Sequence, residues 1–125
     1  MGFCLLGAHV NYTASGLPEA IMQWKPPLVV VLDHSEVWRQ VKAESPHTVL
    51  VGRLVQDARW EPSFNEPSLN PVQAAGDYCA RVLPWAERMG AAYDFWQGVN
   101  EPVIATAEAM RRLAEFEAER ARIMA

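Results

Sequence analysis

Apolar segments of strand length alternate four times with segments of helical periodicity along this chain. Three runs, at residues 3–9, 28–32 and 48–54, are short and apolar, and a fourth, rich in aromatic and β-branched residues, follows Gly90. The runs are apolar throughout instead of alternating with polar residues, as is typical of strands in a parallel sheet covered on both faces. The pattern therefore predicts four parallel strands, the last lying between Ala92 and Pro102.

Helices are expected after each of these strands. Leu17–Trp24 has helical spacing and is stopped by two prolines, and Ser35 is placed to cap a second helix whose buried side carries Trp38 and Val41. The third and fourth helices are predicted over residues 71–89, with Asn70 as N-cap and a kink or division at Pro84, and over residues 103–124, with Pro102 as the first helical residue.

The order of these elements predicts a single (βα)4 domain covering residues 1–125. Right-handed crossovers make such a series either a doubly wound sheet or a segment of a βα barrel. No G-x-G-x-x-G follows the first strand, so the dinucleotide-binding signature is missing. A complete (β/α)8 barrel needs about 250 residues, and this chain has 125.

Composition narrows the classes of partner. The net charge is −4, and the eleven basic residues are scattered apart from the arginines of the last helix, which argues against nucleic acid. The amino-terminal segment MGFCLLGAHV lacks a basic leader and is too short for a membrane span, so we expect no membrane partner and a cytoplasmic location. Cys4 and Cys79 are then expected to be reduced, buried thiols. No cofactor is predicted.

The strand predicted before Pro102 ends in polar residues. Its sequence, WQGVNEP over residues 96–102, resembles the fourth strand of the clan A glycoside hydrolases, which are (β/α)8 barrels. The resemblance implies that Glu101 is the general acid/base and that Asn100 hydrogen-bonds the sugar hydroxyl beside the anomeric centre. A second copy of Asn-Glu-Pro, at residues 65–67, lies in a segment predicted to be a loop.

In βα barrels, ligands bind at the carboxyl ends of the strands and in the loops that follow. This rule selects the following candidates: His9, Asn11, Asp33, His34, Arg53, Gln56, Asp57, Trp60, Asn100 and Glu101. The substrate-binding set is predicted to be His9, Asn11, Asp33, Arg53 and Trp60. Trp60 and Phe64 belong to a long loop over residues 56–70 whose aromatic rings can stack on a sugar.

Each candidate also has a structural interpretation. Glu101 can be a vestigial residue at a helix start, His9 and Asp33 can cap strand ends, Trp60 can pack its loop, and His34 and Trp96 are expected to be structural. No H-x-H or H-E-x-x-H motif supports a metal site, and no G-x-S-x-G elbow supports a nucleophilic serine.

The family's nucleophile lies on strand seven, which a (βα)4 chain does not contain, and retaining hydrolysis needs two carboxyl groups about 5–5.5 Å apart. We therefore expect feeble or no hydrolysis from this chain alone. A half-barrel also leaves two open strand edges, which predicts a homodimer that closes an eight-stranded barrel. Three hypotheses remain open: a glycoside-hydrolase-like half-barrel, a non-catalytic dimer that is structural or binds a saccharide, and a piece of a longer glycosidase.

Overall fold

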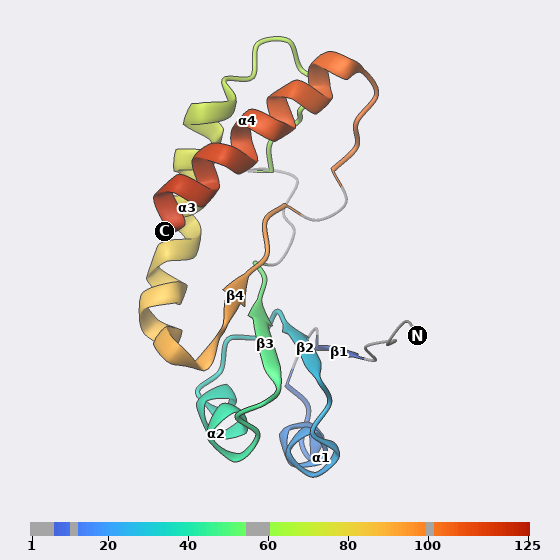
Figure 1. Cartoon of the computed structure of the whole chain (residues 1–125), viewed down its shortest axis with the longest axis vertical. Coiled ribbons are helices and arrows are strands. Elements are labelled where there is room, and N and C mark those ends of the chain that lie inside the picture. Colours follow the sequence, from blue (N-terminus) through green and yellow to red (C-terminus); the bar gives the residue numbers. More distant parts are fainter. Residues whose placement is uncertain (1–6, 11–12, 55–60, 100–101) are drawn as a thin grey trace. The chain divides into compact units, whose positions relative to one another are not determined.

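The computed structural model describes residues 7–10, 13–54, 61–99 and 102–125 (Figure 1). In chain order the elements are β1 (Gly7–Val10), α1 (Leu17–Trp24), β2 (Leu28–Val31), α2 (Val37–Glu44), β3 (Val49–Gly52), α3 (Pro71–Met89), the 3₁₀ turn η1 (Gly90–Ala92), β4 (Phe95–Trp96) and α4 (Ala107–Met124). The chain divides into two compact units, Met1–Leu54 with Trp85–Gln97, and Val55–Pro84 with Gly98–Ala125.

The first unit is built on a parallel sheet with the strand order β1-β2-β3-β4. Each strand pairs with the next one in the sequence, and the register aligns Ala8 with Val29 and Val29 with Leu50. A doubly wound sheet reverses its strand order at a switch point, and no reversal occurs in this sheet. The mixed α/β fold with a four-stranded parallel sheet is therefore compatible with half of a βα barrel.

One face of this sheet carries the core of the first unit. Val29, Val31 and Leu50 are completely buried and form one apolar cluster with Ile21 of α1 and Trp38 of α2. The two helices also contact each other, and Figure 1 shows them side by side. Both helices therefore cover the same face, as expected when consecutive strands are joined by crossovers of one hand.

The opposite face is apolar but less buried. Burial alternates along β2 and β3, so that Val30 and Val51 are half-buried while their neighbours are buried. His9 is aligned with Val30, and Val51 with Phe95, so these residues share a face. Phe95 is 65 % exposed. The apolar cluster with α1 and α2 lies on the other face, so the prediction of a sheet covered on both faces stays a prediction for this one.

The second unit has a small aromatic core between α3, α4 and the segment before α3. The Phe116 ring lies 5.3 Å from that of Phe64 and 5.7 Å from that of Tyr78, in edge-to-face geometry that suits aromatic quadrupoles. Cys79 is a buried free thiol, as predicted, and burial raises its pKa.

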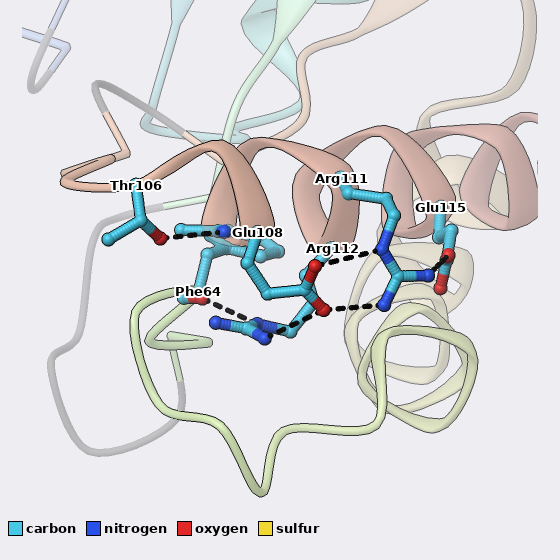
Figure 2. Close-up of polar contacts among 7 residues, drawn as sticks. Phe64, Thr106, Glu108, Arg111, Arg112 and Glu115 are labelled. Atoms are coloured by element: carbon cyan, nitrogen blue, oxygen red, sulfur yellow. Dashed lines mark hydrogen bonds and ion pairs between the residues drawn. The ribbon is translucent and has the colours of Figure 1, made fainter.

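A buried arginine joins α4 to the segment before α3. Nε of Arg112 donates to the Phe64 carbonyl at 2.7 Å, and Nη1 lies 3.4 Å from the Glu108 carboxylate. Figure 2 shows Glu108 bridging Arg112 and Arg111, with Glu115 on the far side of Arg111. The Arg112 cation is thus buried with both a carbonyl and a carboxylate partner, which is the condition for burying a charge at tolerable cost.

Several helix boundaries agree with prediction, and one cap does not. α1 has the predicted bounds, and Asn70 caps α3 by accepting the Gln73 N–H at 3.1 Å. α3 continues through Pro84, so of the predicted kink or division the division does not occur, and the kink stays a prediction. Ser35 does not cap α2: the N-cap is Glu36, and no side chain accepts a capping bond there. The Glu36 carboxylate instead pairs with Arg39 and Arg88.

The fourth strand is much shorter than predicted. β4 contains only Phe95 and Trp96, and η1 occupies the start of the expected strand. Before Phe95 the pairing is irregular: the Asp94 N–H donates to the Leu50 carbonyl at 2.9 Å, but the Leu50 N–H is accepted at 2.8 Å by the Asp94 carboxylate, which also pairs with Lys42. Past Trp96, one more bond, from the Gln97 N–H to the Gly52 carbonyl, continues the pairing.

The last helix begins later than predicted, so Pro102 is not its first residue. α4 starts at Ala107, and the Thr106 hydroxyl caps it by accepting the Ala109 N–H at 3.0 Å (Figure 2). The preceding residues are held outside the helix by Asn65, whose amide donates to the Val103 carbonyl at 2.9 Å and accepts the Ala105 N–H at 2.8 Å. No helix in the described part of the chain is both long and apolar enough to cross a membrane.

Candidate functional site

Asp33 follows β2 and connects the ends of three elements. Its Oδ2 accepts the Thr13 N–H at 2.7 Å, and its carbonyl accepts the Trp38 Nε1–H at 2.8 Å. The residue therefore fixes the loop after β1 against the start of α2. This agrees with the structural interpretation of Asp33 as a residue that caps a strand end. The second carboxylate oxygen can still accept a hydrogen bond.

His9 and Arg53 lie on two other strands of the same sheet. His9 is exposed, on β1, and its alignment with Val30 places it on the face opposite α1 and α2. Arg53 directly follows β3, and its N–H donates to the Val31 carbonyl at 2.9 Å, so it continues the strand pairing. Parallel strands end at one edge, so Asp33 and Arg53 are both at the carboxyl end of the sheet.

The remaining predicted site residues lie outside the described residues. These are Asn11, Gln56, Asp57, Trp60, Asn100 and Glu101. Phe64, expected to offer an aromatic surface to a sugar, is 1 % exposed. That expectation is wrong, because its ring packs against Phe116 within the second core.

Among the described residues of the first unit, three aromatic rings surround His34. The His34 ring lies 5.0 Å from the Trp96 ring, 5.2 Å from the Trp85 ring and 5.6 Å from the Tyr93 ring. Nδ1 of His34 and the Tyr93 hydroxyl share a hydrogen bond of 3.0 Å. Nε2 is buried, and it has no hydrogen-bond partner among the residues that the structure describes.

Electrostatics keep this cluster neutral. Burial lowers the pKa of His34, while the nearby backbone of Arg53 and the Asp33 carboxylate offset part of that effect. Burial also raises the pKa of Tyr93, helped by the Asp33 charge. At neutral pH the pair is therefore a neutral imidazole and a neutral phenol, an arrangement suited to packing and hydrogen bonding more than to proton transfer.

Gly52 makes the cluster possible. A Cβ at this position would lie 2.7 Å from Cδ2 of Tyr93 and 2.8 Å from the Trp96 ring, far inside van der Waals contact. Only glycine allows both rings to lie against β3. Trp96 is half-buried and packs against the apolar core, as expected, and His34 is buried, while its structural role stays a prediction.

The contributions of Tyr93 and Trp85 were not predicted. Tyr93 appeared in the sequence as an ordinary strand residue, and Trp85 as part of a helix after Pro84. The signal that could have found them is the concentration of aromatic residues on both sides of Gly90, a turn glycine with a positive φ of 51°. Such a turn folds the end of α3 back toward β4.

Metal binding finds no support in the described geometry. Among the residues that the structure describes, no three His, Cys, Asp or Glu side chains lie close enough to hold an ion. Comparison of the chain with protein-family models, with curated proteins and with solved structures gives no match.

Proposed function

We propose that this chain is the amino-terminal half of a βα barrel of the glycoside-hydrolase kind, completed by a second four-stranded half. The observation that carries the proposal is the consecutive parallel order β1-β2-β3-β4 with α1 and α2 on one face. In a barrel that helix-covered face points outward, and the face bearing Val30, Val51 and Phe95 points inward. The second half is either another copy of this chain or a further segment of a longer protein.

The saccharide is proposed to bind where the strands end. Asp33 and Arg53 stand at that edge, and His9 lies on the face that would line the barrel. The proposed site also includes four residues predicted from the sequence alone, Asn11, Trp60, Asn100 and Glu101. By the resemblance of WQGVNEP, Glu101 supplies the acid/base carboxyl and Asn100 positions a sugar hydroxyl.

Catalysis requires a second carboxyl group from the other half of the barrel. If the two carboxyl groups lie about 5–5.5 Å apart, hydrolysis retains the anomeric configuration of the sugar. If they lie about 6.5–9.5 Å apart, a water molecule fits between them and hydrolysis inverts the anomeric configuration. In a two-fold dimer, the second group would be Glu101 of the other copy. A misplacement of about 1 Å costs a factor of about 100, so we expect feeble or no turnover from this chain alone.

The test uses the duplicated Asn-Glu-Pro sequence as its own control. Hydrolysis of an activated aryl glycoside is compared in wild type, Glu101→Gln and Glu66→Gln, the last being exposed in the second unit. Turnover that is lost in Glu101→Gln but kept in Glu66→Gln would establish the catalytic role. Equal background rates in all three proteins would reduce the proposal to a barrel without chemistry.

One observation favours a second candidate, a non-catalytic dimer that is structural or binds saccharide. β4 ends at Trp96 and α4 begins at Ala107, so a long link separates them where the resemblance implies direct passage from strand to helix. Light scattering should give about twice 14.0 kDa for either dimer. Phe95→Glu places a charge on the proposed inner face and should halve this mass. Met110→Glu makes the same kind of change at an exposed apolar residue of α4 and should leave the mass unchanged.

A further inference from the structure

A shallow pocket of about 360 Å³, largely open to solvent, lies between the loop after β1 and the loop after β2, entirely within the first unit. Its polar lining includes Thr13, Asp33 and Ser35, and its apolar lining includes Pro18 and Val37. The volume is at the lower end of the range for small-molecule sites, about 300–1,000 Å³. It therefore suits a ligand of about one sugar ring.

The hydroxyls of this pocket are not satisfied by the protein. The Thr13 Oγ1 and Ser35 Oγ atoms are buried, and neither has a hydrogen-bond partner among the described residues. Buried polar groups in folded proteins nearly always have a partner, which can be a protein group, an ordered water or a ligand. Both residues line the pocket, so the two hydroxyls without partners belong to its wall.

The carboxylate beside them is held in place. Asp33 Oδ2 accepts the Thr13 N–H at 2.7 Å, which fixes the side chain and leaves Oδ1 to accept from a ligand. The same bond positions Thr13. Asp33 and Thr13 thus form a rigid pair on two different loops, a better basis for recognition than a mobile surface charge.

The lining excludes some chemical classes. Among the described residues, its lining contains two carboxylates, of Asp33 and Glu19, and no lysine, arginine or histidine, which disfavours an anion. An ammonium group can donate to the carboxylates and to the hydroxyl oxygens, but it has no acceptor for the hydroxyl protons. A neutral polyol can both donate and accept, and its C–H surface can pack against Pro18 and Val37.

We propose that this pocket binds one ring of a neutral polyhydroxylated ligand, with Asp33, Thr13 and Ser35 as its hydrogen-bonding groups. The inference rests on the proposed function only for the sugar-like class of the ligand. The pocket is on the helix-covered side of the loops, and its use requires neither a closed barrel nor Glu101.

The experiment is a titration of the intact ¹⁵N-labelled chain with D-xylose, followed by amide chemical shifts. We expect shifts concentrated at residues 13–19 and 33–37, and an apparent Kd raised about 5-fold to 10-fold in both Asp33→Asn and Ser35→Ala, consistent with the loss of one hydrogen bond. Ser68→Ala, an exposed serine of the second unit, should bind as wild type does.

Three outcomes would overturn the proposal. The first is the absence of shifts at a xylose concentration of about 100 mM, which is about 100-fold above a millimolar Kd. The second is a set of shifts that is the same in wild type, Asp33→Asn and Ser35→Ala. The third is binding of methylammonium chloride in these loops that is stronger than the binding of xylose. Because the titration does not depend on hydrolysis, xylose binding in these loops together with equal aryl-glycoside rates in wild type and Glu101→Gln would support the pocket while refuting the catalytic function.

Discussion

The Tyr93 hydroxyl lies 3.0 Å from Nδ1 of His34, so a residue that follows β2 and one that precedes β4 share a buried hydrogen bond. Trp85 and Trp96 enclose the imidazole. A protonated imidazole would lose solvation in this cluster, which is why burial lowers the pKa of His34.

The stability of the protein should therefore fall in mild acid through His34. Its pKa is lowered from an ordinary value of 6.5, so below that pH the unfolded chain binds more protons than the folded one. Stability is fully present above about pH 6.5 and declines as the pH falls toward the lower pKa of the folded state. Urea unfolding between about pH 7.5 and about pH 5.5 should show this slope. The slope should be weaker in His34→Gln and kept in His47→Gln, which alters an exposed histidine; identical slopes in wild type and His34→Gln would contradict it.

Gly52→Ala should destabilise the first unit by about 1–3 kcal/mol, the usual cost of overpacking. The added methyl would meet the Tyr93 and Trp96 rings at 2.7 and 2.8 Å, and neither ring can move without disturbing the His34 cluster. Gly76→Ala is the matched control, because a Cβ there meets nothing within 4 Å and lies within α3. The control should be stabilising by about 0.5–1 kcal/mol. Urea unfolding measures both, and equal midpoints would refute the close contact.

Arg112→Met should cost about 1.5–3 kcal/mol, because it removes a charged donor and leaves the Phe64 carbonyl without its bond. The methionine keeps an apolar stem of similar length, so the packing of this buried side chain is largely retained. Arg111→Met, one residue earlier, removes only exposed ion pairs to Glu108 and Glu115, which solvent screens, and should cost much less. A thermal unfolding series in which both variants cost the same would show that burial of Arg112 contributes nothing.

Asn65→Ala should release the segment before α4. Loss of the bonds to the Val103 carbonyl and the Ala105 N–H should cost about 0.5–1.5 kcal/mol for each, or about 1–3 kcal/mol together, which is a change of about 5-fold to 140-fold in local opening. Hydrogen exchange at the Ala105 amide should accelerate accordingly. Ser63→Ala, in the same segment but exposed, provides the comparison. If the Ala105 amide exchanges equally fast in wild type and Asn65→Ala, the amide bridge does not restrain the chain.

The elements predicted correctly are those whose signals are local. α1 is bounded by Gly16, in the left-handed region at a φ of 82°, and by the prolines after Lys25, so both of its ends are visible in the sequence. The Asn70 cap and the apolar runs of β2 and β3 are equally local. Their bounds follow from residues within a turn or two of each end.

The failures involve partners distant in sequence. Before β4 the Leu50 N–H bonds the Asp94 carboxylate and not a backbone carbonyl, and before α4 Asn65 holds Val103 and Ala105 outside the helix. Neither long-range contact leaves a mark in the surrounding residues. The same applies to the site: proximity of Asp33 to Thr13 follows from adjacent parallel strands, whereas the enclosure of His34 by Trp85 and Tyr93 depends on how α3 and η1 return to the sheet.

The consecutive order of the strands has a consequence for how the chain folds during synthesis. Gly7 pairs with Leu28 and Leu28 with Val49, so the first two ladders close loops of equal length, while the pairing of Val51 with Phe95 closes one about twice as long. Contacts of short sequence separation form faster. Each strand also pairs with the strand synthesised just before it, which has already left the ribosome. We expect β1, β2 and β3 to assemble as a nascent βαβαβ intermediate, with β4 added as the final strand.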